Sequence, residues 1–324
     1  MEDAFLRAES FSAAPVGMLA EAAYDTAGDY QGGHAKLGYK FSPAWSVTAG
    51  YWYRDLNYST SQAQVQSWQL ATDYGILVHP VEGRKLTFRL SVWGDYADKV
   101  SKSGTSQLHG TTFTDVSLAR PSDTQVQADL IYTGQPWINH FVTGFVSAGY
   151  SWVSAGDLTA GVQQGNCQYN LRVSSNDMAS ATLAQPCRIG RAVVNNASFS
   201  VNASQYGMQP SQDFNYGAAF VGLGGSWRWQ RSGFSVTLAY HFQYLFRDLE
   251  DRLAAYGAPK AQFNQTVGLE LSYAPVRQLE FFVRGQGFQN SLIGYVPMLY
   301  NPVTAKKLDK EYGLVTVGIR LALW

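Results

Sequence analysis

Apolar and polar side chains alternate along residues 234–247, which read FSVTLAYHFQYLFR. The even positions are all apolar or aromatic, whereas the odd positions are small or polar apart from one leucine. A period of two over this length predicts an extended strand whose two faces lie in different surroundings. Strands of soluble proteins are usually about 5–6 residues long. About 14 residues, tilted by roughly 40°, rise some 35 Å, enough to cross the ~25 Å apolar band of an outer membrane. The segment is therefore interpreted as one strand of a transmembrane β-barrel.

The same alternation recurs along the rest of the chain and predicts about twelve strands. Closed antiparallel barrels of the bacterial outer membrane have even strand numbers, which fits this count. The fold class predicted is therefore all-β, a closed antiparallel transmembrane barrel. The other predicted strands are 16–25, 33–41, 45–55, 66–78, 86–96, 124–133, 141–152, 216–229, 263–273, 279–290 and 311–324.

The predicted connections alternate between short and long. This is typical of outer-membrane barrels, with short turns at the periplasmic rim, long extracellular loops and both termini in the periplasm. Residues 1–15 are expected to form a periplasmic segment or a plug, and 16–324 the barrel. The short connections are 42–45, 80–85, 134–139, 230–233 and 274–278, and the long ones are 56–65, 97–123, 153–215, 248–262 and 291–310. Within them, 101–122 is expected to be a Ser/Thr/Gly-rich loop and 155–212 the longest extracellular loop.

Composition narrows the class further. The mean hydropathy is −0.17 and no run approaches the ~18 apolar residues of a membrane-spanning helix. The formal net charge is zero and no basic run indicates a nucleic-acid partner. The first ten residues, MEDAFLRAES, carry acids where a signal peptide has positive charge, so a mature or trimmed form is expected.

The final strand, EYGLVTVGIRLALW, carries a family resemblance. An amphipathic last strand ending in an aromatic residue is similar to the assembly signal of bacterial outer-membrane β-barrel proteins, of the porin, channel or exporter-barrel type. Trp324 departs from that signal, because it has the parity of Arg320 and Thr316; either a bulge resets the register or Trp324 lies beyond the strand. The resemblance implies a Gram-negative outer membrane, contact with lipid and lipopolysaccharide, recognition by the outer-membrane assembly machinery through this strand, and no cofactor.

Charged side chains recur on the polar faces of the predicted strands, with acids and bases nearly balanced. They either pair with one another to fill a narrow lumen or line a polar pathway, with a locally basic wall at Lys36, Lys40 and Arg54. The turn at 274–278 makes Glu270 and Arg284 neighbours and predicts a salt bridge. The predicted pore-lining residues are Glu21, Lys36, Lys40, Trp52, Arg54, Asp73, Arg89, Trp93, Asp129, Arg228, His241, Arg247, Glu270, Arg284 and Arg320, with Asp25, Asp95 and Glu280 as further acids on this face.

Several aromatic residues also take inward parity. They could stack on sugar rings, although plain packing inside the lumen is the simpler interpretation. These residues are Trp52, Trp93, Phe145, Phe220 and Phe282.

Cys167 and Cys187 lie in the longest predicted loop with nineteen residues between them. In an oxidising compartment two cysteines of one surface loop usually pair, which predicts a disulfide. A metal site would need further ligands, and neither histidine nor a nearby pair of acids has that spacing.

These features favour an outer-membrane channel that passes small polar solutes without a chemical step. One alternative is the barrel domain of a larger exporter or translocator, carrying polysaccharide or protein and trimmed of its periplasmic or passenger part. Others are a surface structural or adhesive barrel and an outer-membrane hydrolase. An enzyme is not expected: His241 is the one histidine well inside a predicted strand, and a Ser–His pair needs geometry that sequence does not supply.

Overall fold

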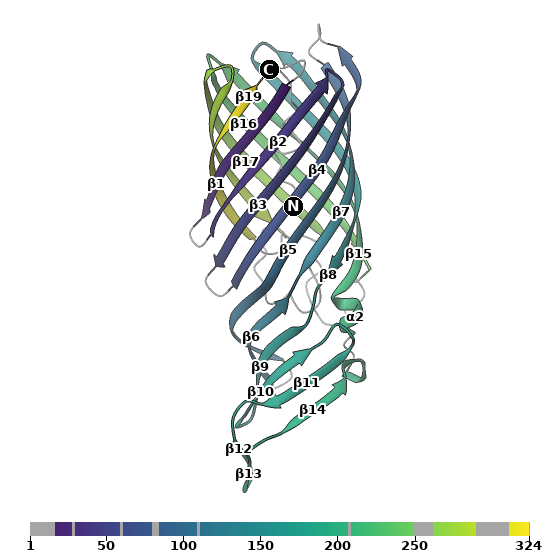
Figure 1. The fold of residues 1–324 in the computed structure, drawn as a ribbon, viewed down its shortest axis with the longest axis vertical. Helices are drawn as coiled ribbons and strands as arrows, with labels where there is room; N and C mark the ends of the chain where they lie inside the picture. The colour runs from purple at the N-terminus through teal and green to yellow at the C-terminus, as the bar shows by residue number, and fades with distance from the viewer. Residues whose placement is uncertain are drawn as a thin grey trace.

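Twelve antiparallel strands close into a barrel in the computed structural model (Figure 1). The structure describes residues 17–27, 30–58, 61–79, 84–108, 111–206, 209–248, 262–289 and 311–323. The barrel strands are β1 (Gly17–Ala27), β2 (Tyr30–Ser42), β3 (Trp45–Tyr58), β4 (Ser61–His79), β5 (Arg84–Leu108), β7 (Ser122–Trp137), β8 (His140–Ser154), β15 (Asn215–Arg231), β16 (Phe234–Arg247), β17 (Phe263–Val276), β18 (Leu279–Gln289) and β19 (Glu311–Leu323).

Pairing between the two ends of the described chain closes the barrel. β1 pairs with β19 from Met18 opposite Leu323 to Thr26 opposite Val315. Each other barrel strand pairs with its neighbours in chain order, except that β5 pairs with β7 and β8 with β15. The predicted class and the twelve strands are therefore confirmed.

A sheet projects from one end of the barrel, at the bottom of Figure 1. β5 runs beyond the barrel wall and pairs there with β6, and the sheet continues through β9, β10, β11 and β14. Its strands are β6 (Thr111–Ala119), β9 (Leu158–Gln164), β10 (Cys167–Val173), β11 (Met178–Leu183) and β14 (Ser198–Asn202); a separate hairpin, β12 (Cys187–Ile189) and β13 (Ala192–Val194), and two short helices, η2 (Ala203–Tyr206) and α2 (Pro210–Asp213), complete it.

The prediction that 101–122 and 155–212 are loops is thus wrong for most of their length. Their strands are short and carry many Ser, Thr, Asn and Gln residues, so the alternation that marks the barrel strands is weak here. The predicted loop 56–65 is also too long, because β3 and β4 remain paired as far as Tyr58 and Ser61. The N-terminal segment, the loop 291–310, Trp324 and most of 248–262 lie outside the described residues.

The disulfide between Cys167 and Cys187 is confirmed. Its Cα atoms are 5.2 Å apart, and it joins β10 to the β12–β13 hairpin. No helix in the described parts of the chain is long and apolar enough to span a membrane.

The two faces of the barrel wall differ as the alternation predicts. On β16 the Gln243 side chain is buried inside the barrel, whereas Leu238, Tyr240 and Phe246 are exposed on the outside. Large apolar side chains are likewise exposed on each of the remaining eleven barrel strands. An outer surface of this kind is suited to lipid, and the polar groups are left to the lumen.

Candidate functional site in the barrel lumen

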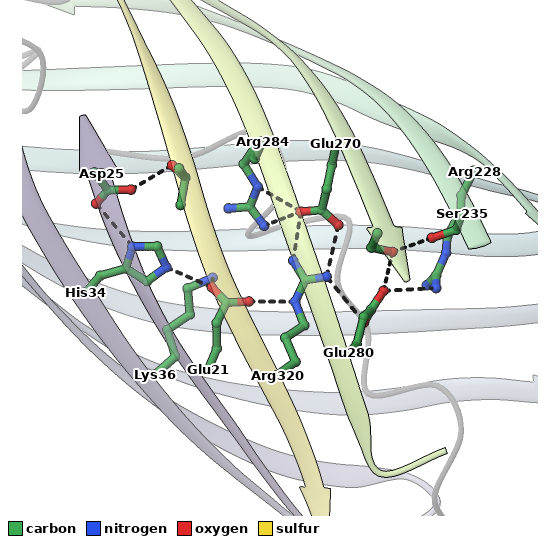
Figure 2. Close-up of polar contacts among 12 residues, drawn as sticks. Glu21, Asp25, His34, Lys36, Arg228, Ser235, Glu270, Glu280, Arg284 and Arg320 are labelled. Atoms are coloured by element: carbon green, nitrogen blue, oxygen red, sulfur yellow. Dashed lines mark hydrogen bonds and ion pairs between the residues drawn. The ribbon is translucent and has the colours of Figure 1, made fainter. Parts of the chain in front are cut away.

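A continuous network of charged side chains lies on the inner face where the barrel closes (Figure 2). Arg320 on β19 is its centre. Its guanidinium donates to Glu21 on β1 at 2.7 Å, to both carboxylate oxygens of Glu270 on β17 at 2.9 and 2.8 Å, and to Glu280 on β18 at 3.4 Å. Arg284 donates to Glu270 as well, at 2.9 and 2.7 Å, which confirms the predicted salt bridge.

The same network reaches β2 through Glu21. Lys36 lies 2.7 Å from a carboxylate oxygen of Glu21, and the His34 ring is 2.8 Å from the same atom. The other ring nitrogen of His34 is 3.2 Å from Asp25, which accepts a 2.6 Å hydrogen bond from Thr316. Because Glu21 balances Lys36, the expected basic wall is not uniformly basic: one of its three cations belongs to an ion-paired cluster.

A second set of charges lies across β3, β4 and β5. Arg89 donates to both oxygens of Asp73, at 2.6 and 2.9 Å. Arg54 donates to the Ser67 hydroxyl at 2.7 Å, and Ser67 in turn donates to Asp95. Charge-assisted and bidentate hydrogen bonds of this kind hold side chains firmly in place. The charged side chains in this part of the lumen are thus held in place by polar partners on adjacent strands.

Aromatic rings lie among these charges. The Trp52 ring stacks between His34, at 5.8 Å, and Trp93, at 6.3 Å, as measured between ring centroids. The Phe282 ring lies beneath Arg320, whose guanidinium carbon is 4.1 Å from the ring centroid. Trp52, Trp93 and Phe282 are all buried, the last two to 2% exposure. Water therefore does not reach these rings in this conformation.

The structure places all fifteen predicted pore-lining side chains on the inner side of the barrel. Fourteen are buried, whereas the Arg228 side chain remains 37% exposed and lies 3.7 Å from Glu280. Six of the fifteen belong to the network around Arg320, one on each of β1, β2, β15, β17, β18 and β19: Glu21, Lys36, Arg228, Glu270, Arg284 and Arg320. Whether any of these residues lines a conducting path stays a prediction.

Asp123 and Gln127 are inner-face residues outside the predicted pore-lining set, although the alternation in 124–133 does put Gln127 on the polar face. Asp123 is opposite Asp95 in the register and lies 3.3 Å from the Ser151 hydroxyl; Gln127 donates to Asp129 at 2.6 Å. Asp123 lies one residue before the predicted start of its strand. Gln127 shares the parity of the predicted acid Asp129, a signal that the sequence did contain.

The hydrolase alternative gains little from the geometry. The side chains of Ser147 and His241 border the same small space beside Gly222 on β15. A Cβ built at Gly222 would lie 2.5 Å from Ser147 Oγ and 3.1 Å from His241 Nε2. Yet the Ser147 hydroxyl has no hydrogen-bond partner in the part of the chain that the structure describes, so it does not donate to that ring. Nor do the described residues contain a group of three or more His, Cys, Asp and Glu side chains that could hold a metal ion.

No protein-family model and no curated protein matches the chain. Solved structures of similar fold include the translocator domain of the autotransporter NalP from Neisseria meningitidis, with 9% identity, a TM-score of 0.45 and coverage of 96% of this chain and 89% of that one. The NanC porin has 7% identity, a TM-score of 0.44 and coverage of 94% and 98%. The β-domain of the Bordetella autotransporter BrkA has 11% identity, a TM-score of 0.44 and coverage of 96% and 100%.

The class is decided by the barrel itself, in which twelve strands close with an apolar outer face and a polar inner face. The chain folds as a transmembrane β-barrel. The lumen of this barrel is lined by ion pairs and hydrogen bonds that cross from strand to strand.

Proposed function

We propose that this barrel is a gated outer-membrane channel for small polar solutes. The observation that carries the proposal is the inner wall, where charged and amide side chains occur on β1–β5, β7 and β15–β19. An outer-membrane anchor has no need of so many buried charges, because desolvating them is costly. A solute path explains their presence, since hydrated solutes need polar groups along the bore.

The burial of the same side chains supports a gate rather than a permanently open pore. Arg284 is fully buried, and Glu21, Asp95 and Asp129 are almost so. We place the short-turn rim on the periplasmic side and the projecting sheet outside the cell, as the alternation of connections indicates. Opening would then require the aromatic and charged side chains of the inner wall to move apart.

A second candidate is the barrel of an exporter or translocator. The closed inner wall favours it too, because a barrel that passes a polymer only during export must otherwise stay sealed. The two candidates differ in one respect: a solute channel admits small solutes without a partner, whereas a translocator barrel does not.

A liposome-swelling assay distinguishes the solute channel from the translocator barrel. Vesicles containing the purified barrel are diluted into neutral sugars of graded size, and swelling reports their entry. A gated channel predicts slow swelling with the smallest sugars and faster swelling with Trp93→Ala, which removes a buried inner ring. Trp152→Ala, which removes an exposed outer ring, is the matched control and should leave the rate unchanged.

Two other results would count against the channel. Equal, background swelling for all three proteins would refute it and favour the translocator. Equal acceleration by both substitutions would mean that leakage follows loss of stability rather than opening of the lumen.

A further inference from the structure

β19 closes the barrel by pairing with β1, a strand from the opposite end of the described chain. A tight turn normally fixes the register of the two strands that it joins, and no turn joins β1 to β19. Side chains must therefore set the register at which the barrel closes.

The outer face of the β1–β19 pair, the seam of the barrel, distinguishes poorly between the native register and a slipped one. Ala22 on β1 is opposite Ile319 on β19, and the flanking outer residues of β19, Val317 and Leu321, are also aliphatic. A slip of two residues keeps every side chain on its own face and only exchanges one aliphatic partner for another. Apolar contacts with lipid and with neighbours are thus nearly equal in the native and the slipped registers.

The inner face of the seam distinguishes strongly between the native and slipped registers. In the observed register Glu21 is opposite Arg320 and Asp25 is opposite Thr316, and both pairs form hydrogen bonds, at 2.7 and 2.6 Å. A slip of two residues would bring Glu21 opposite Gly318 or Ala322. Both hydrogen bonds would be lost at once, and the buried Glu21 and Asp25 would keep only their contacts with Lys36 and His34 on β2.

Arg320 also fixes the position of β19 relative to β18 and β17, the strands on the side away from β1. It contacts Glu280 on β18 and both oxygens of Glu270 on β17, two strands away (Figure 2). Its guanidinium also lies over the Phe282 ring. We propose that Arg320 and its carboxylate partners Glu21, Glu270 and Glu280 form a register pin that selects the closing register of the barrel. This role holds whether the barrel conducts solutes or exports a polymer.

The test uses pairs of cysteines placed on the outer face of the seam. Ala22→Cys with Ile319→Cys reports the native register, and Ala22→Cys with Leu321→Cys or Val317→Cys reports the two slipped registers. Directly opposed residues of adjacent strands are close enough for a disulfide, and copper phenanthroline with oxygen serves as the oxidant. The full-length refolded protein keeps its native disulfide, and mass spectrometry of digested peptides identifies which cysteines are joined.

The pin predicts that only the native pair crosslinks in the otherwise unchanged protein. Arg320→Ala should raise the slipped crosslinks at least about tenfold, the factor that corresponds to losing one strong hydrogen bond. Arg320→Lys should give an intermediate yield, because one ammonium cannot hold three carboxylates in the same geometry. The matched control is Arg228→Ala, which removes another inward arginine near Glu280 from β15, a strand whose register the turn to β16 sets.

If Arg320→Ala does not fold, Glu21→Gln with Asp25→Asn tests the same pin with side chains of equal size. Native crosslinks alone in every folded variant would overturn the proposal. So would slipped crosslinks that rise as much with Arg228→Ala as with Arg320→Ala.

Discussion

At the scale of single residues, the lumen depends on small side chains that let large ones approach. A Cβ built at Gly318 on β19 would lie 2.5 Å from the Phe282 ring and 2.5 Å from Ala23 Cβ. That ring supports the guanidinium of Arg320 from below. Glycine at this position therefore positions the charged network as well as filling a place in the strand.

Gly318→Ala should lower the free energy of unfolding by about 1–3 kcal/mol, the usual cost of overpacking. Gly285→Ala is the matched control on β18, because a Cβ there would meet nothing within 4 Å. Urea titration of the barrel in detergent, followed by tryptophan fluorescence, measures both. Equal stability of the two variants would show that Phe282 can move aside at no cost.

At the scale of elements, the register of β16 decides which residues face lipid. Spin labels at Phe242→Cys and Gln243→Cys should behave oppositely: the label at 242 is relaxed by lipid-soluble oxygen and the label at 243 by a water-soluble reagent or by neither. The reason is that Gln243 is buried in the lumen while Phe242 lies on the outer face. Stronger oxygen relaxation at 243 than at 242 would show the register to be shifted by one residue.

The disulfide joins β10 to the β12–β13 hairpin in the projecting part of the chain and touches none of the barrel strands. Cys167→Ser with Cys187→Ser removes a crosslink whose loop corresponds to about 3 kcal/mol in the chain-entropy model. Hydrogen exchange should therefore speed up in β10, β12 and β13 and stay unchanged in β16 and β17. Uniform acceleration would mean that the barrel and the sheet unfold together, and no change would mean that strand pairing alone holds the sheet.

The sequence predicts the barrel strands well because each one separates lipid from a polar interior. Phe234–Arg247 shows that separation over its whole length, and the short turn after β17 was enough to predict the pair Glu270–Arg284. The projecting strands carry a weaker pattern, because they are short and rich in Ser, Thr, Asn and Gln. Arg320 and Glu21 lie 299 positions apart, so their contact follows from barrel closure and not from any local signal.

At the scale of the whole molecule, many of the charged side chains are buried as ion pairs inside a barrel whose outer face is apolar. Glu21 with Lys36, Asp73 with Arg89 and Glu270 with Arg284 are such pairs. Removing one partner of a buried ion pair costs about 3–5 kcal/mol, so these pairs resist the side-chain movements that would open the lumen. A channel built in this way should be closed most of the time.

Single-channel recording of the purified barrel in a planar bilayer tests the central claim most directly. The account predicts discrete, infrequent openings for the unchanged protein, and more frequent or larger ones for Trp93→Ala than for the outer-face control Trp152→Ala. A general porin added to the same membrane afterwards confirms that the bilayer can report conductance. A bilayer that stays silent with all three barrel proteins, and then conducts with the porin, would contradict a solute path through this lumen.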